Sequence, residues 1–273
     1  MTDQAPPAAS PLATPEPWTL VADAYAVELV PLFEPFSRDA LRLAELPRAA
    51  RIADVATGPG TLALMAAESG ATVSALDFSD SMIAQLRRRV AEARLAGVEA
   101  EVGDGQALPF RSDAYDGAFS MFGLMFFPDR AAGFRELRRI LRRRGRAVVG
   151  SWAPYQGSML VLMESLTAVL PDLPFKNGGW PLSDPTDLTR EMAAAGFSDV
   201  MVHSITHSKT APSAAELWGS VQRTMAPIVL LRHRMGEERW AITAPRIFER
   251  MHRELGNGPV ELALTAYLGV GSK

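Results

Sequence analysis

The stretch IADVATGPGT, residues 52–61, decides the fold of this chain. Its apolar first half predicts a strand over 51–56, and an apolar helix pattern begins at Thr61. Between the two lie Gly58 and Gly60. Glycines in such a turn bring backbone N–H groups close to a ligand, because a Cβ would block the approach or forbid the backbone angles. The stretch therefore predicts a ligand-binding turn in an α/β fold.

An acidic residue follows at the end of the next predicted strand, which spans 72–76. This residue is Asp77, and a carboxylate in that place accepts hydrogen bonds from the ribose hydroxyls of a bound nucleoside. Dinucleotides and S-adenosylmethionine (SAM) both fit a glycine-rich turn followed by an acid. The dinucleotide pattern has a third glycine where this chain has Ala63, but alanine is accepted in some such sites. The turn alone therefore leaves both ligands open.

From about residue 50 to 152 the chain alternates short apolar runs with amphipathic helices, which is typical of a parallel sheet. Further strands are predicted at 98–102, 115–122 and 147–152, and helices at 61–69, 79–96 and 129–145. We expect Gly145 to end the last of these helices as its C-terminal cap. A helical stretch over 18–33 precedes this region, and the Pro- and Ala-rich residues 1–17 are predicted to be disordered.

The last part of the chain has a different pattern. It predicts an apolar helix at 158–170, a helix from Asp184 to Gly196, a strand at 199–208, helices from Ser213 and over 236–256, and a final strand at 261–269. We expect the helix over 236–256 to be kinked or split at Pro245, because proline lacks an N–H and clashes with the preceding turn.

Composition excludes several classes of site. The 273 residues contain no cysteine, which removes disulfides, thiolate metal sites and cysteine nucleophiles. The four histidines form no metal-binding pattern, so we expect no metal. A net charge of -3 argues against nucleic acid as a partner, and the arginine runs at 87–89 and 138–146 are interpreted as solvated helix faces. The chain shows neither a membrane-spanning apolar stretch nor a secretory signal, so we expect a cytoplasmic protein.

Five motifs in order carry a family resemblance: DVATGPGTLAL, ALDFSDSMI, VGDGQALPF, YDGAFSMFGLMFFPD and FRELRRILRRRGRAVVGSW. They resemble the class I SAM-dependent methyltransferases, in particular the small-molecule branch that includes the ubiquinone/menaquinone C-methyltransferases. The resemblance is close over 18–152 and weaker beyond. It implies a Rossmann-like α/β fold, doubly wound around a seven-stranded, mostly parallel sheet whose last strand is antiparallel. It also implies one domain over 18–273 with its cofactor-binding core at about 50–152.

The resemblance also implies which residues bind SAM. These are Asp54, Thr57, Gly58, Gly60, Ser120 and Met121 for the methionine part, Asp77 for the ribose, Phe78, Met82, Asp104, Gly105 and Gln106 for the adenine, and Tyr25 as a cover over the cofactor. The chain departs from the family pattern at the first position of the turn, where Ala56 replaces the usual glycine. It departs again before the fifth strand, where Arg143-Arg144-Gly145 replaces proline-glycine-glycine.

Methyl transfer from a sulfonium is an in-line displacement that depends on positioning and on exclusion of water. It leaves no necessary catalytic signature, and the catalytic residues stay unknown, with Tyr25, His233 and His252 as candidates for a general base. Segments 153–182 and 209–258 are rich in Met, Leu, Trp and Phe, and we expect them to form a helical lid over an apolar small-molecule site.

The expected reaction is methylation of an O, N or C atom of a small, apolar or aromatic metabolite. Two alternatives stay open. The chain could be a SAM-fold protein that binds the cofactor without methylating, in a regulatory or cyclase-like role, or an NAD-dependent oxidoreductase, which Ala63 allows.

Overall fold

The computed structural model describes residues 10–170, 173 and 180–273. Seven strands form one sheet in the order β3-β2-β1-β4-β5-β7-β6. The strands are β1 (Arg51–Val55), β2 (Thr72–Asp77), β3 (Val98–Val102), β4 (Tyr115–Met121), β5 (Leu141–Trp152), β6 (Ser198–Ala211) and β7 (Val260–Ser272). Neighbours among β1 to β5 are parallel, and β7 runs antiparallel to both β5 and β6. The sheet predicted from the resemblance is confirmed, including its antiparallel last strand.

Helices cover both faces of the sheet because successive strand residues point to opposite sides. Ile52 packs into one core with α2 (Val30–Ala44), α3 (Thr61–Glu68) and α4 (Asp80–Glu92). Its neighbour Ala53 packs into the other core with α5 (Arg130–Ile140) and α7 (Pro185–Ala194). The sheet is therefore buried on both sides and its strand ends are left to form a site.

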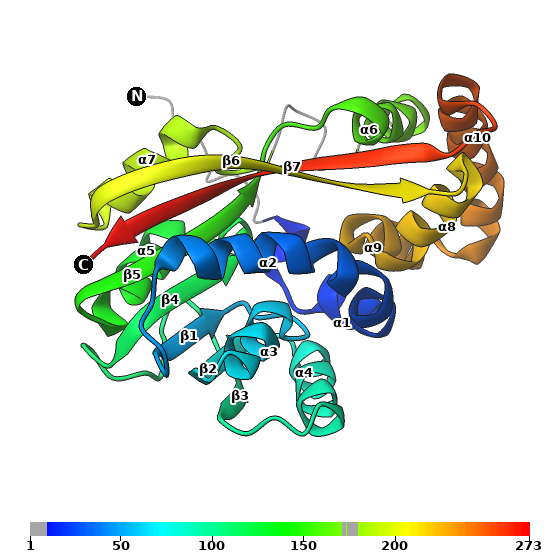
Figure 1. The fold of residues 1–273 in the computed structure, drawn as a ribbon. Helices are drawn as coiled ribbons and strands as arrows, with labels where there is room; N and C mark the ends of the chain where they lie inside the picture. The colour runs from blue at the N-terminus through cyan, green and yellow to red at the C-terminus, as the bar shows by residue number, and fades with distance from the viewer. Residues whose placement is uncertain (1–9, 171–172, 174–179) are drawn as a thin grey trace, which may run out of the picture.

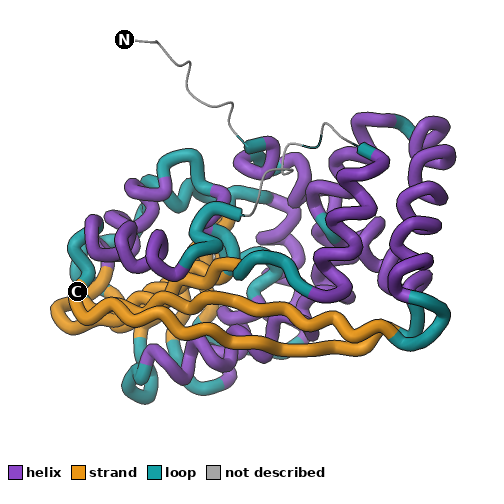
Figure 2. The backbone as a smooth tube through the Cα atoms, turned by 90° about the horizontal axis from the view of Figure 1, so that it is seen from above, coloured by secondary structure: helices purple, strands orange, loops and turns teal. Residues whose placement is uncertain are grey.

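Two long strands extend well past the rest of the sheet. β6 has 14 residues and β7 has 13, against five in β1. The two pair along most of their length, as far as Ala211 opposite Val260. At that far end the chain inserts α8 (Ala214–Thr224), α9 (Ala226–Met235) and α10 (Glu237–Leu255), which gather beside the paired strands (Figures 1 and 2).

The inserted helices have a hydrophobic core of their own. They pack with α6 (Gly157–Val169) through buried side chains that include Leu162, Trp218, Trp240 and Ile247. The Trp218 and Trp240 rings stack with centroids 6.1 Å apart. A separate core lets this helical group hold its shape at a distance from the main sheet.

The N-terminal segment is more ordered than its composition predicts. Residues 10–17 hold a 3₁₀ turn, η1 (Pro11–Ala13), and the start of α1 (Glu16–Ala24), so the prediction of disorder over 1–17 is wrong for them. Leu12 is 2% exposed and packs against α1 and α4, a tertiary contact that composition does not show. Residues 1–9 lie outside the described residues.

The helix predicted over 18–33 is interrupted by one π-helical turn, η2 (Tyr25–Leu29). The N–H of Val30 donates to the carbonyl of Tyr25, five residues back. Pro31 follows, and its ring would clash with the carbonyl four residues earlier in a regular α-helix. A wider turn relieves that clash, and such turns are frequent at functional sites.

Two predicted details are wrong, and one helix was not predicted. Gly145 is not a helix cap, because α5 ends at Ile140 and the chain is already extended at Leu141, opposite Tyr115. Pro245 does not split α10, since it lies on the exposed face of a continuous helix where water can replace the missing hydrogen bond. The helix α9 was not predicted. Within the described ranges, no helix is long and apolar enough to cross a membrane.

Candidate functional site

The turn between β1 and α3 has three residues with left-handed backbone angles. Ala56, Gly58 and Gly60 have φ of 57°, 56° and 81°. A Cβ on Gly60 would lie 2.1 Å from the Leu86 side chain, so glycine is required there for packing against α4. Gly60 lines none of the cavities described below. The structure therefore gives Gly60 a packing role, and its predicted part in holding the methionine portion of SAM stays a prediction.

Asp77 connects the turn after β1 to the turn after β2 by hydrogen bonds. One carboxylate oxygen accepts a hydrogen bond of 2.8 Å from the N–H of Gly58, and the other accepts one of 2.9 Å from the N–H of Ser79. Arg89 supports the same turn from α4 by donating to the carbonyl of Pro59 at 2.6 Å. Arg89 is thus not part of a solvated face as predicted, and Arg139 likewise donates to backbone carbonyls, at Leu108 and Phe110.

A second carboxylate lies beneath the turn. Asp54 is 1% exposed and accepts a hydrogen bond of 2.6 Å from the Thr57 hydroxyl. Both residues line a small inner cavity of about 40 Å³, together with Tyr25, Gly58 and Met121 among others. Five of the predicted cofactor-binding residues therefore meet in one place.

Burial changes the acidity of both carboxyl groups. It raises the pKa of Asp54 to about 7, with a further rise from the negative charge of Asp77, against the lowering effect of the Thr57 hydrogen bond. Burial likewise raises the pKa of Asp77 to about 6, although backbone hydrogen bonds from Ser79, Gly58 and Phe78 act in the opposite direction. A cationic group placed beside them would favour the ionised forms.

A middle cavity of about 90 Å³ adjoins the inner one. It is lined by the predicted residues Tyr25, Gly58, Asp77, Phe78, Met82, Asp104, Gly105, Gln106 and Met121, and by apolar neighbours that include Leu12 and Trp18. The exposed Asp104 carboxylate accepts hydrogen bonds from the backbone and side chain of Gln106, at 2.8 and 3.0 Å. Ser120 lines none of the three cavities, because its hydroxyl is fully buried and accepts a hydrogen bond from the N–H of Leu124.

Ala56 stands where the family pattern has glycine, and its Cβ packs against Gly123, which follows β4. A Cβ built on Gly123 would lie 2.3 Å from it. The chain thus has alanine at one of these two facing positions and glycine at the other. A left-handed alanine costs about 1 kcal/mol, and the surrounding turn must hold it in place.

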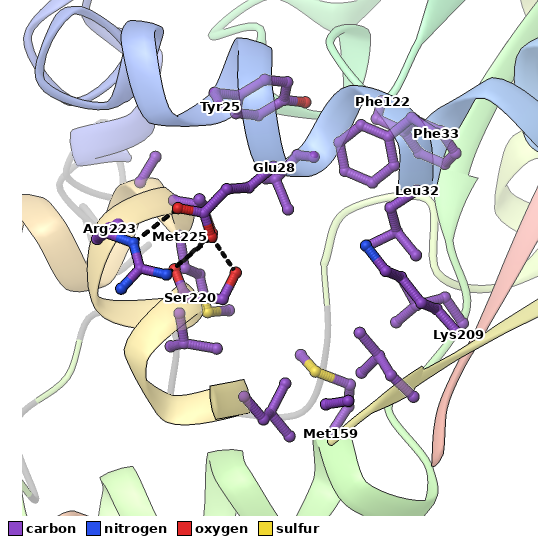
Figure 3. Close-up of a pocket in the computed structure, with 18 of the residues that line it drawn as sticks. Tyr25, Glu28, Leu32, Phe33, Phe122, Met159, Lys209, Ser220, Arg223 and Met225 are labelled. Atoms are coloured by element: carbon purple, nitrogen blue, oxygen red, sulfur yellow. Dashed lines mark hydrogen bonds and ion pairs between the residues drawn. The ribbon is translucent and has the colours of Figure 1, made fainter. Parts of the chain in front are cut away.

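Tyr25 and Phe122 line the inner cavity, the middle cavity and a third, outer cavity. Phe122 has a left-handed φ of 62°, a strained angle for a bulky residue, and its ring stacks on Trp152 with centroids 3.8 Å apart. Burial, and secondarily the charge of Asp77, raises the pKa of the Tyr25 hydroxyl above its ordinary value, so it stays protonated at neutral pH. The Phe33 ring packs against the rings of Tyr25 and Phe122, with its centroid 5.6 Å from each of theirs (Figure 3).

The outer cavity is the largest, at about 500 Å³, and most of its wall is apolar. It lies between the core and the inserted helices, with side chains from η2, α2, β5, α6, β6, α8 and β7. Trp152, the last residue of β5, and Tyr155, which follows the strand, both line it. Its polar side includes Glu28, which accepts hydrogen bonds from Arg223 at 2.6 and 3.1 Å and from Ser220 at 2.7 Å (Figure 3).

Two predicted base candidates lie elsewhere. His233 is exposed near the end of α9, and His252 stacks on Phe248 within α10. Neither lines one of the three cavities. Their sequence positions in a lid segment do not reveal which helix face meets the site. Among the described residues, no cluster of three His, Asp or Glu side chains is placed to bind a metal ion.

Sequence reasoning missed the pair Glu28 and Arg223, which are 195 positions apart. It also missed Leu12 and Lys209, both of which line cavities. No local pattern marks such residues, because the long strands β6 and β7 bring the distant segments together. The helix predicted to start at Ser213 is confirmed, since α8, which carries Arg223, begins at Ala214 and the Ser213 hydroxyl accepts a hydrogen bond from the N–H of Glu216.

Part of the chain is similar to known methyltransferases. Residues 52–145 match a family model described as a methyltransferase domain. The ubiquinone/menaquinone biosynthesis C-methyltransferase of Geobacter sulfurreducens is 34% identical over 116 residues, which cover 41% of this chain and 45% of that protein. This chain spans about half the length of the curated relatives that it matches first. The matched region supports the resemblance to the class I SAM-dependent methyltransferases that the five motifs carry.

Solved structures share the fold at low identity. The phosphoethanolamine N-methyltransferase 2 of Haemonchus contortus, in complex with phosphomonomethylethanolamine and S-adenosylhomocysteine, has a TM-score of 0.58 at 16% identity, covering 92% of this chain and 56% of that chain. The [4+2]-cyclase SpnF has a TM-score of 0.53 at 16% identity, covering 86% and 80%. The same fold thus occurs in proteins named for different chemistries.

The raised pKa values predict how stability depends on pH. Asp54 and Asp77 bind protons more tightly in the folded chain than in the unfolded chain, so the unfolding free energy falls as pH rises through about 6 and 7. The loss is on the order of 1 kcal/mol for each unit by which a pKa is raised. Urea unfolding of the ligand-free protein from pH 5 to pH 8 measures it.

The variant Asp54→Asn cannot ionise at this position, so we expect it to lose less stability than the wild type over the same pH range. Asp199→Asn, which changes an exposed carboxylate, serves as the matched control and should follow the wild-type profile. Parallel profiles for the wild type and Asp54→Asn would show that Asp54 does not carry the raised pKa.

The contact between positions 56 and 123 predicts a compensating pair. Gly123→Ala forces two Cβ atoms together, and we expect a loss of roughly 1–3 kcal/mol of stability. Adding Ala56→Gly removes the clash, so the double variant should regain most of that loss. Chemical denaturation of the wild type, both single variants and the double variant decides the matter. A double variant as unstable as Gly123→Ala alone would mean that Ala56 is not the conflicting group.

Proposed function

We propose that this chain, whose residues 52–145 form a class I SAM-dependent methyltransferase domain, transfers a methyl group from SAM to a small acceptor held in the outer cavity. One observation carries the proposal. The inner and middle cavities, built from the predicted cofactor-binding residues, meet a much larger apolar cavity at Tyr25 and Phe122. A cofactor on one side and an acceptor on the other would bring their reacting atoms together there.

The residues around the inner cavity fit the methionine part of SAM. Asp54 and Asp77 are buried, and their hydrogen-bond donors include the Thr57 hydroxyl and the N–H groups of Gly58 and Ser79. Because these donors are neutral, a ligand ammonium group would supply the missing positive charge. A dinucleotide would instead bring its negative pyrophosphate to the turn beside Asp54. The charge of the site therefore supports SAM over NAD.

The middle cavity fits the nucleoside part. Asp77 has carboxylate oxygens that can accept from ribose hydroxyls, Phe78 and Met82 offer apolar surface for the adenine, and Asp104 lies at the exposed end of the cavity. Ser120 and Gly60, which the resemblance also implied, would act indirectly by supporting the loop after β4 and the packing of the turn.

SAM supplies an activated methyl group on a sulfonium. The chain's own contribution is to orient the acceptor, exclude water and align the two ligands for in-line transfer. The Tyr25 hydroxyl, kept protonated by burial, acts as a hydrogen-bond donor and not as a base. With His233 and His252 away from the cavities, catalysis rests on positioning.

The acceptor would be apolar or aromatic because of the walls it meets. Rings of Phe33, Phe122, Trp152 and Tyr155 line the outer cavity, and Met159 adds an adaptable surface. The two segments predicted as lids, about 153–182 and 209–258, supply one side of this cavity through their described residues. We infer that they select the acceptor, within one domain that extends from the N-terminal helices to β7.

A second candidate function is cofactor binding without methyl transfer, as in a cyclase-like or regulatory protein. The fold is shared with a protein named as a cyclase, which supports this alternative. Incubation with methyl-labelled SAM and a metabolite extract separates the two, because methyl transfer moves the label into a new compound and mere binding does not.

Ligand-induced thermal stabilisation tests the choice of cofactor. We expect S-adenosylhomocysteine to raise the melting temperature by several degrees, since a ligand at a hundredfold excess over its Kd adds about 2.7 kcal/mol of stability. NADH at the same concentration should have no effect. Stabilisation by NADH but not by S-adenosylhomocysteine would favour the oxidoreductase alternative and exclude the proposed cofactor.

The role of Asp77 predicts the effect of its removal. Asp77→Ala should weaken S-adenosylhomocysteine binding at least about tenfold, or roughly 1.4 kcal/mol, because it removes the ribose acceptor and releases the N–H of Gly58. Isothermal titration calorimetry measures the change, with Glu99→Gln, an exposed carboxylate in β3, as the control. Unchanged affinity in Asp77→Ala would remove the role given to this residue.

A further inference from the structure

The outer cavity has an apolar body and one charged side. Among the described residues, four charged ones line it: Glu28, Lys209, Glu216 and Arg223. Three of them are tied to one another. Arg223 donates two hydrogen bonds to Glu28, and the charge of Glu216 raises the pKa of the Arg223 guanidinium further. Glu28 is thus paired with Arg223, and Glu216 interacts with Arg223 through its charge alone.

Lys209 stands apart from this set. Its side-chain ammonium group forms no hydrogen bond or ion pair with another described residue, although its charge contributes to lowering the pKa of Glu28. Glu28 already has its hydrogen bonds, from Arg223 and Ser220. Lys209 therefore offers an ammonium group with all of its donors available.

Strand register places this ammonium group on the cavity side. Lys209 pairs directly with Leu262 across β6 and β7, and paired residues in antiparallel strands point to the same face of the sheet. Leu262 and Leu264 both line the outer cavity. Figure 3 shows the Lys209 nitrogen pointing from β6 into the space between Glu28 and Leu32.

The residue type is itself unusual for this chain. The sequence has 28 Lys and Arg residues, and only three of them, Lys176, Lys209 and Lys273, are lysine. All the other residues of this basic set are arginine. A lysine is a compact point charge on a flexible apolar stem, which suits an apolar cavity wall that must present one cation to a ligand.

We propose that the acceptor is an amphiphilic carboxylate, with an apolar ring-bearing body along the aromatic walls and its carboxylate on Lys209. This inference rests on the proposed function and names the class of acceptor. The charged end at Lys209 would leave the opposite end of the acceptor to reach Tyr25 and Phe122, where the methyl group arrives. Lys209 is then a specificity-determining residue and not a catalytic one.

A matched pair of fluorescent probes tests the proposal. 1-Pyrenebutyrate carries an apolar ring system and a carboxylate, and 1-pyrenebutanamide has the same shape without the charge. Binding of each is measured by pyrene fluorescence at low salt, with S-adenosylhomocysteine at saturation. We expect the wild type to bind the acid about threefold or more tightly than the amide, and 0.5 M NaCl to reduce this preference.

Three variants separate the role of Lys209 from general charge. Lys209→Met keeps the apolar stem and removes the charge, so it should bind acid and amide equally. Lys209→Arg should keep the preference. Arg250→Met removes one positive charge from an exposed site on α10 and should behave as the wild type.

Each outcome is decisive. Equal binding of the two probes by the wild type, binding of neither, or a preference that survives in Lys209→Met would overturn the proposal. Failure of S-adenosylhomocysteine to stabilise the wild type would instead count against the proposed function. Unchanged S-adenosylhomocysteine stabilisation in Lys209→Met would show that this variant remains folded and that the two results are independent.

Discussion

The site depends on two carboxylates held out of water beneath a glycine-containing turn. Asp77 joins the turn after β1 to the turn after β2 through the N–H groups of Gly58 and Ser79. Asp54 lies below, hydrogen-bonded to Thr57. Burying two acids near each other is unfavourable, and the raised pKa values express that cost. The folded chain accepts it because the same atoms define where a cationic ligand can be bound.

The rest of the fold places the large outer cavity next to these acids. The strands β6 and β7 extend beyond the sheet and carry α8 to α10 at their far end. The strand β6 is tied back to α2 where His207 hydrogen-bonds to Asp39 at 2.8 Å and its ring meets Phe36 edge-on. This contact connects the strand that bears the cavity wall to the helix that follows Tyr25. Cofactor side and acceptor side are thus built on one continuous frame.

Sequence reasoning succeeded where the signal was local. The turn at Gly58, the acid at Asp77 and the alternation of strands and helices all follow from neighbouring residues, and the seven-stranded sheet with its antiparallel last strand follows from the family resemblance. It failed where a tertiary contact decided the outcome. Gly145, which was predicted to cap a helix, lies within the strand β5. Pairs such as Glu28 and Arg223 depend on the long strands, which no local period predicts.

The insertion between β6 and β7 begins and ends at paired positions, since Ala211 lies opposite Val260. Its helices also have a core largely of their own, with α6. A segment with adjacent ends and its own core can be replaced by another of different length without moving the sheet. The helices α8 to α10, and with them one wall of the outer cavity, can therefore be exchanged as a unit while the turn and its two acids keep their positions.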